Sequence, residues 1–136
     1  MISHKKLDIH QLKRFIISGG TAVVFHLGTM ALLVWLGVNA SLSTSAGVIV
    51  GAVVNYIFQY YYTFDSDEKH NSSVFKYIIT VSISFVSNLI LFTLFHNLLH
   101  NGVIVSQLLT SAIVALQNYL IYKKFVFLRQ GVSHEA

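Results

Sequence analysis

The fold of this chain is decided by residues 15–36, which read FIISGGTAVVFHLGTMALLVWL. These 22 residues include no Asp, Glu, Lys or Arg, and as a helix they would extend about 33 Å, enough to cross the hydrocarbon core of a bilayer. A basic segment before an apolar stretch is also typical of a signal peptide. This stretch is too long for one, and no small-residue cleavage pattern leading into a soluble chain follows it. We therefore expect a retained transmembrane helix.

Three more stretches have the length and the apolar character of membrane spans. They cover residues 42–62, 75–99 and 102–122. Hydrophobic residues make up 54% of the chain and charged residues only 10%, against about a quarter in soluble domains. The length of 136 residues leaves room for four spans and short loops, but not for a separate soluble domain. We expect an all-α integral membrane protein with a single domain over residues 1–136.

Positive charge gathers at three places along the chain. The nine basic residues are Lys5, Lys6, Lys13, Arg14, Lys69, Lys76, Lys123, Lys124 and Arg129. They lie before the first span, between the second and third, and after the fourth, whereas the other two loops have none. Because basic loops are retained on the cytoplasmic side, we expect both termini in the cytoplasm and a multi-pass protein of the cytoplasmic (inner) membrane. The basic residues are then topological anchors, and we expect no nucleic-acid partner.

The two halves of the chain share a pattern that indicates a duplicated helical hairpin. Residues 14–18 (RFIIS) recur as residues 76–80 (KYIIT), at an offset of 62. The second span of each half leads into Asn55, Tyr56 and Phe64, which recur at an offset of 63 as Asn118, Tyr119 and Phe127. The repeats cover about residues 12–64 and 74–127. Because each repeat has two spans, both have the same orientation, and we expect parallel hairpins related by a twofold-like axis along the membrane normal.

Small residues in the second span indicate close helix packing. Gly47 and Gly51 form a GxxxG motif, and Asn55 continues the same face of the helix. In the fourth span, Ser111 and Ala115 form a weaker version of this motif. Small residues in lipid serve mainly for backbone approach. We therefore interpret the glycines as packing sites, within the monomer or between monomers, rather than as a ligand groove.

Polar side chains inside the apolar spans are the main candidates for an internal site. They are His26, Asn55, Gln59, Asn88, Gln117 and Asn118. His26 and Asn88 occupy equivalent positions in the two repeats, and a polar group in hydrocarbon is costly unless it has a partner. A shared internal site and simple hydrogen bonds between helices explain this pair about equally well. For Asn55 and Asn118 the recurrence slightly favours function over helix capping.

Basic and aromatic residues alternate at the expected cytoplasmic boundary. The cations are Arg14, Lys76, Lys123 and Lys124. The aromatic residues interleaved with them or near them are Phe15, Tyr56, Tyr60, Tyr61, Tyr62, Tyr77, Tyr119, Tyr122 and Phe125, of which Tyr56, Tyr77, Tyr119 and Tyr122 are the chosen candidates. Cations would bind the phosphate of a lipid, and ring faces would contact its sugar or its chain. The same composition is typical of any inward membrane edge. Both interpretations stay open on these residues alone.

The patterns of conventional enzymes are missing from the sequence. It has no HExxH, no GxSxG, no Gly-rich phosphate loop and no cysteine. The spans hold no Asp or Glu, which argues against a proton-coupled exporter. Asp65, Ser66 and Asp67 have the spacing of a DxD metal motif, but a short acidic run in a polar loop is usually solvated. We expect no enzymatic activity, no metal and no cofactor.

The order of these motifs resembles the GtrA-like family of bacterial and archaeal membrane proteins. The resemblance covers about residues 12–127 and rests on four spans, Arg14-Phe15 before the first, and an Asn-Tyr-x(7)-Phe tail after the second and the fourth. Tails in that family usually carry a basic residue five positions after the Asn. Lys123 fits this in the second tail, whereas Tyr60 stands there in the first.

The resemblance implies a role in the synthesis of cell-surface polysaccharides, since members of the family are associated with O-antigen, teichoic acid and arabinogalactan modification. It implies flipping of a polyprenyl-phosphate-linked sugar through the membrane lipid to the outer leaflet, where a separate membrane glycosyltransferase uses it. The residues implied are Arg14, Lys76, Lys123 and Lys124 for the phosphate, and His26, Asn55, Asn88 and Asn118 for the headgroup path. Four helices can hardly enclose such a headgroup, so we expect a homo-oligomer. The alternative is a non-transporting adaptor that anchors or stabilises a glycosyltransferase.

Overall fold

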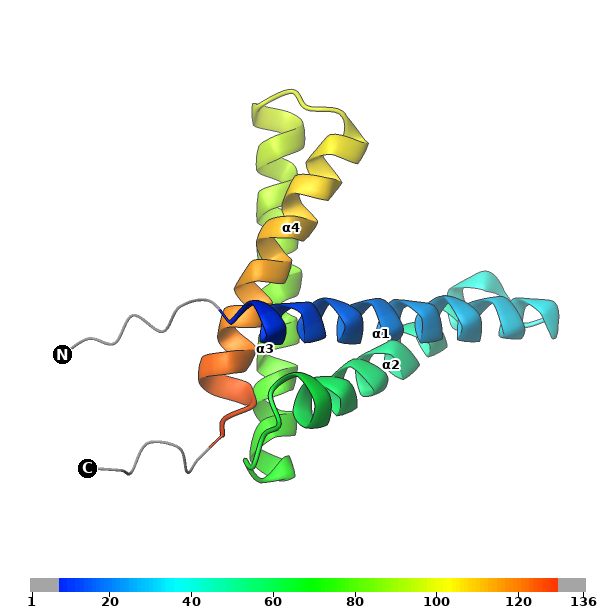
Figure 1. Cartoon of the computed structure of the whole chain (residues 1–136). Helices are drawn as coiled ribbons and strands as arrows, with labels where there is room; N and C mark the ends of the chain where they lie inside the picture. Colours follow the sequence, from blue (N-terminus) through cyan, green and yellow to red (C-terminus); the bar gives the residue numbers. More distant parts are fainter. Residues whose placement is uncertain (1–7, 130–136) are drawn as a thin grey trace, which may run out of the picture. The chain divides into compact units, whose positions relative to one another are not determined.

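The structure is a computed structural model that describes residues 8–129 as helices joined by short loops, with no strand in that range (Figure 1). The α-helices are α1 (Ile9–Trp35), α2 (Ala40–Phe58), α3 (His70–Thr93) and α4 (Val103–Ile121). π-Helical turns extend the last three of them: η1 (Gln59–Thr63), η2 (Leu94–Leu98) and η3 (Tyr122–Val126). The predicted all-α fold is confirmed.

Four helices are long and apolar enough to cross a membrane. With their π-helical turns they cover Ile9–Trp35, Ala40–Thr63, His70–Leu98 and Val103–Val126. Large apolar side chains along them are exposed, among them Trp35 at 80% and Ile104 at 76% of their surface. A soluble protein rarely exposes so much apolar surface, whereas a membrane protein presents it to lipid. The prediction of a multi-pass protein with four spans is confirmed.

Helix α1 begins at Ile9, six residues before the start of the predicted span at Phe15. The cause is Asp8, whose Oδ1 accepts hydrogen bonds from the backbone nitrogens of His10 at 3.0 Å and Gln11 at 3.2 Å. A carboxylate in this position satisfies free N–H groups and the positive end of the helix dipole. Hydropathy marks the part of a helix that lies in hydrocarbon, and capping decides where the helix starts.

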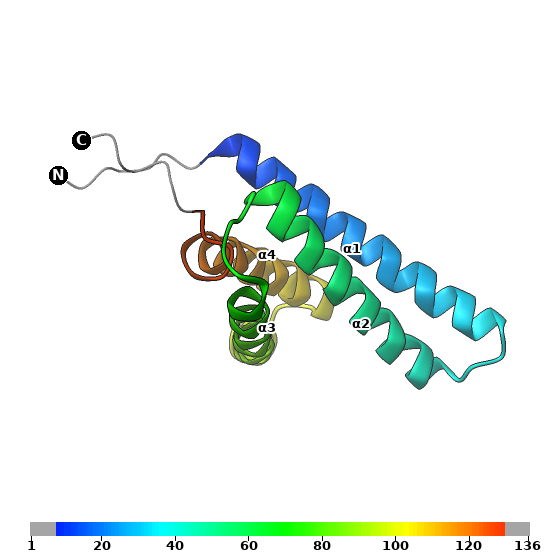
Figure 2. The same cartoon turned by 90° about the horizontal axis from the view of Figure 1, so that it is seen from below.

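The chain divides into two compact units between Ser66 and Asp67. Among the described residues, the first unit consists of α1, α2 and η1, and the second of α3, η2, α4 and η3. Each unit is a helical hairpin, and α1 and α2 of the first run side by side (Figure 2). The division falls between the predicted repeats, which end at residue 64 and begin again at residue 74.

The first hairpin is closed by contact between the two glycines of α2 and His26 of α1. A methyl group added at Gly47 would lie 2.6 Å from both Cδ2 and the carbonyl oxygen of His26. One added at Gly51 would lie 3.1 Å from the carbonyl oxygen of Ala22 and from Cβ of His26. Such distances leave no room for a side chain at Gly47. The GxxxG motif therefore serves close packing, as predicted, and it does so inside the chain.

The second hairpin has larger residues at the positions that correspond to the two glycines. These are Thr110 and Val114 of α4, and both are buried. Ser111 and Ala115 are exposed, so the weaker motif does not pack inside this hairpin, and packing between monomers stays a prediction for it. The packing face runs back from Asn118 in steps of four, to Val114 and then Thr110, because residues four apart share a helix face.

A π-helical turn ends the second helix of each hairpin at corresponding positions. The backbone nitrogen of Phe64 donates to the carbonyl oxygen of Gln59 at 3.0 Å, and that of Phe127 donates to Tyr122 at 2.8 Å. Each Phe directly after the wider turn is buried, Phe64 at 4% and Phe127 at 1% exposure, and the Phe127 ring contacts Tyr77 and Tyr122 of its own hairpin. The Phe nine residues after each Asn is thus the buried residue that follows the π-helical turn, which gives the Asn-Tyr-x(7)-Phe spacing a structural cause.

Candidate functional site

Each hairpin carries a cation against an aromatic ring at its basic end, the end at which its first helix begins and its second ends. In the first hairpin, Cζ of Arg14 lies 5.4 Å from the centroid of the Tyr62 ring, and Nη1 donates to the Tyr62 carbonyl oxygen at 3.5 Å. In the second, Nζ of Lys76 lies 5.2 Å from the centroid of the Phe125 ring. The cations are 62 residues apart and the rings 63, so the two pairs occupy corresponding positions. Both have the geometry of cation–π contacts.

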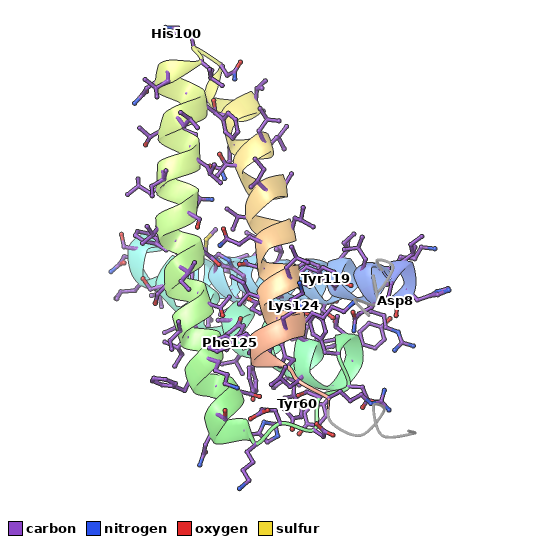
Figure 3. All side chains as sticks on the ribbon, turned by 90° about the vertical axis from the view of Figure 1, so that its left-hand side faces the viewer. Asp8, Tyr60, His100, Tyr119, Lys124 and Phe125 are labelled. Atoms are coloured by element: carbon purple, nitrogen blue, oxygen red, sulfur yellow. The ribbon has the colours of Figure 1, made fainter. Side chains whose placement is uncertain are left out.

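The second hairpin has an additional cation–ring pair. Nζ of Lys123 lies 5.7 Å from the centroid of the Tyr119 ring. At the corresponding place in the first hairpin, Tyr60 lies against Tyr56 with 6.0 Å between ring centroids. Lys124 follows Lys123 on η3 and is exposed (Figure 3). The basic end of the second hairpin therefore offers more positive charge to a phosphate than the first.

Lys76 has an acidic neighbour as well as an aromatic one. Its Nζ lies 3.8 Å from Oε1 of Glu68, and the two side chains are 21% and 16% exposed. An ammonium group that is partly shielded from water interacts more strongly with an anion than an exposed one does. A phosphate bound at Lys76 would compete with the Glu68 carboxylate for the same charge.

Most of the tyrosines predicted as site residues are buried inside the basic ends of the hairpins rather than exposed on their surface. Tyr77, Tyr119 and Tyr122 are buried, and Tyr56 is half-buried. Tyr77 and Tyr122 have ring centroids 5.6 Å apart, and both rings contact the ring of Phe127. The rings that carry the cations, those of Tyr62 and Phe125, are 39% and 43% exposed. The sequence had placed both among the aromatic residues at the boundary, and their offset of 63 residues is the signal that would have singled them out as a corresponding pair.

The polar residues of the spans have different surroundings. Oδ1 of Asn55 accepts a hydrogen bond from Nε2 of Gln59 at 3.1 Å, within α2 and its π-helical turn. Oδ1 of Asn118 accepts one from Oγ of Ser84, which joins α4 to α3. His26 packs against the glycines of α2. These three candidates thus have structural contacts in their own hairpins.

Asn88 lines an open groove of about 380 Å³ in the second hairpin. The lining residues are Val81, Ser84, Phe85, Asn88, Leu89 and Val114. Asn88 was predicted as a site residue from the sequence, and Ser84 was not. The signal that could have found it is the spacing of four residues from Lys76 through Thr80 and Ser84 to Asn88, which places a polar stripe along α3.

The acidic loop has no metal-binding geometry. Within residues 8–129 no group of three His, Cys, Asp or Glu side chains is arranged to hold a metal ion. The backbone nitrogen of Asp67 donates to the carbonyl oxygen of Leu128 at 3.1 Å, and Glu68 contacts Lys76. The loop thus ties the start of the second hairpin to its end.

Comparison with known proteins assigns the chain to a family. The model of the family described as GtrA/DPMS, transmembrane domain, matches residues 14–127, which include both hairpins and all the cation–ring pairs. No curated protein and no solved structure matches the chain. The chain is therefore a multi-pass membrane protein of glycosylation or polysaccharide synthesis that belongs to the GtrA/DPMS transmembrane-domain family.

Proposed function

We propose that this protein moves a polyprenyl-phosphate-linked sugar from the inner to the outer leaflet of the cytoplasmic membrane. A membrane glycosyltransferase then uses the sugar for cell-surface polysaccharide or teichoic acid glycosylation. Both termini lie in the cytoplasm in this proposal, because the three basic segments of the chain are on one side of the four spans. The protein itself breaks no covalent bond, and the lipid chain stays in the bilayer while the headgroup crosses.

The observation that carries the proposal is the repeated cation–ring pair, Arg14 on Tyr62 and Lys76 on Phe125. The cation supplies a charge for the phosphate, and the exposed ring supplies an apolar face for the first part of the lipid chain or for the sugar. Cations that served only to set the orientation would not require a ring at a fixed distance. Two such pairs at corresponding positions suit a substrate that has one phosphate between a sugar and a hydrocarbon chain.

The proposal predicts that the purified protein accelerates transbilayer movement of such a lipid. The protein would be reconstituted in liposomes that contain radiolabelled citronellyl phosphate glucose, or its mannose or galactose counterpart, and exposure of the sugar to external periodate would be followed. We expect faster exposure than in protein-free liposomes for at least one of the three sugars. Liposomes with an unrelated four-span protein control for leakage.

A rate equal to that of protein-free liposomes for every sugar would contradict transport. It would favour the adaptor, in which the exposed apolar faces of the helices anchor a glycosyltransferase in the membrane. Co-purification of a glycosyltransferase from the native membrane, together with loss of its activity when this protein is removed, would support that function.

We further propose that the protein works as a homo-oligomer. Each hairpin has only two helices, and the apolar exposure of all four spans leaves little protein to surround a sugar headgroup. We expect a particle larger than one chain of 15.2 kDa in mild detergent and in nanodiscs, measured by mass photometry or light scattering with the detergent contribution subtracted. A monodisperse monomer in both media would contradict this prediction.

A further inference from the structure

The two hairpins differ in how closely their helices approach. In the first, Gly47 and Gly51 let α2 come against the backbone of α1 at His26. In the second, Thr110 and Val114 stand at the corresponding places, and both are buried; Val114 lines the groove together with residues of α3. Side chains of that size hold two helices further apart than glycines do. The groove beside Val114 is the result, and the second hairpin is open where the first is closed.

The groove has mostly apolar walls and one free amide. Val81, Phe85 and Leu89 are exposed along it. The hydroxyl of Ser84 lies within hydrogen-bond distance of two acceptors, the carbonyl oxygen of Thr80 and Oδ1 of Asn118, so its one hydrogen is already used. The half-buried amide of Asn88, in contrast, has no hydrogen-bond partner among the described residues. An amide in hydrocarbon without a partner is costly, which favours a ligand that supplies one.

The free amide is in line with the cation at the basic end. Lys76, Thr80, Ser84 and Asn88 are four residues apart, on a stripe that winds slowly around α3. The twelve residues from Lys76 to Asn88 correspond to about 18 Å of helix, roughly half the thickness of a bilayer core. The amide therefore lies near the middle of the membrane when Lys76 is at its surface. The groove volume of about 380 Å³ is within the usual range of ligand pockets.

We propose that the groove of the second hairpin alone receives the sugar headgroup, and that the Asn88 amide hydrogen-bonds a sugar hydroxyl at mid-membrane. This inference rests on the proposed transport function and specifies the path within it. The phosphate binds first at Lys76, and the sugar then lies between Val114 and the exposed wall of α3. An amide both donates and accepts, as a hydroxyl does, so it discriminates little between sugars. His26, although equivalent to Asn88 in the repeat, closes the first hairpin and contacts no substrate.

Asn88→Leu is expected to reduce the periodate-exposure rate in liposomes at least tenfold. Asn97→Leu, the same change at an exposed amide further along the same helix, is its matched control and is expected to keep the wild-type rate. His26→Leu tests whether the first hairpin also takes part in moving the sugar. We expect the transport rate of His26→Leu per folded molecule, counted after gel filtration, to stay within about twofold of the wild-type rate, because the groove of the second hairpin is unchanged.

A second pair of variants tests the groove without touching its amide. Val114→Phe places a larger side chain in the groove and is expected to slow transport at least fivefold, whereas Ile113→Phe adds the same ring on the exposed side of α4 and is expected to have no effect. The melting temperature of each variant in detergent would be measured to show that it folds.

The possible results distinguish failure of the proposed groove path from failure of the proposed transport function. If wild type accelerates exposure but Asn88→Leu and Val114→Phe do so equally well, transport stands and the groove is not its path. Equal loss in His26→Leu and Asn88→Leu overturns the assignment to the second hairpin alone. If Asn88→Leu turns an oligomer into a monomer, the amide pairs with a second copy and the proposal is wrong. If wild type is inactive, the transport function fails and this path fails with it.

Discussion

Gly47→Ala is expected to lower the stability of the protein by about 1–3 kcal/mol, the usual cost of an extra group in a well-packed core. The added methyl would lie 2.6 Å from the carbonyl oxygen of His26, which belongs to the backbone of α1 and cannot rotate away. The two helices would have to separate along their whole contact. The measurement is the unfolding midpoint in detergent, by circular dichroism or by fluorescence of Trp35 at the end of α1.

Gly28→Ala is the matched control, since it makes the same change in the same hairpin. Apart from the neighbouring residues and backbone of its own helix, no atom lies within 4 Å of a methyl group placed there. Alanine has a higher helix propensity than glycine by up to about 1 kcal/mol, so this variant should be unchanged or slightly more stable. Equal midpoints for the two variants would mean that the first hairpin is not closed by its glycines.

The spans were predictable from the sequence because hydrocarbon tolerates few charges. Long runs without Asp or Glu, with Lys76 at the edge of the third as their one basic residue, mark them directly. The helix ends were not predictable, because they depend on single polar side chains such as Asp8. Hydropathy is a mean over many residues and does not show the effect of one side chain. The π-helical turns were missed for a related reason. A turn such as Gln59–Thr63 leads into the buried Phe64, and burial depends on tertiary contacts that no local propensity reports.

The candidate site was predicted in its parts but not in its arrangement. The repeat identified Arg14 and Lys76 as corresponding cations, and the structure adds the rings on which they lie. The same symmetry suggested that His26 and Asn88 share a role, whereas their surroundings differ. The difference comes from the facing helix, where glycine in one repeat and valine or threonine in the other set the distance between helices. A pattern of equivalent positions cannot show this unless the facing residues are compared too.

Lys76→Ala is expected to lower the transport rate roughly tenfold to a hundredfold. A hydrogen bond to a charged group contributes about 1.5–3 kcal/mol, and each 1.4 kcal/mol is about a factor of ten. The loss should be in the upper part of this range because Lys76 is only partly exposed and lies at the start of the stripe that leads to Asn88. Lys76→Arg keeps the charge and the contact with the Phe125 ring, so we expect it to retain most of the rate. The measurement is the initial rate of periodate exposure at several lipid concentrations.

Lys69→Ala separates phosphate binding from topology, because it removes the same charge near the same end of α3, at an exposed residue just before the helix. A cation that only retains the loop in the cytoplasm can be replaced by its neighbours, since the orientation depends on the sum of the charges. A cation that binds phosphate cannot be replaced by neighbouring cations, because its position relative to the groove is fixed. We therefore expect a large loss for Lys76→Ala and almost none for Lys69→Ala, with the orientation of both checked by protease access to the termini. Equally small losses of transport rate in the two variants would mean that Lys76 is only a topological anchor. The proposed path would then lack the charge that binds the phosphate at its start.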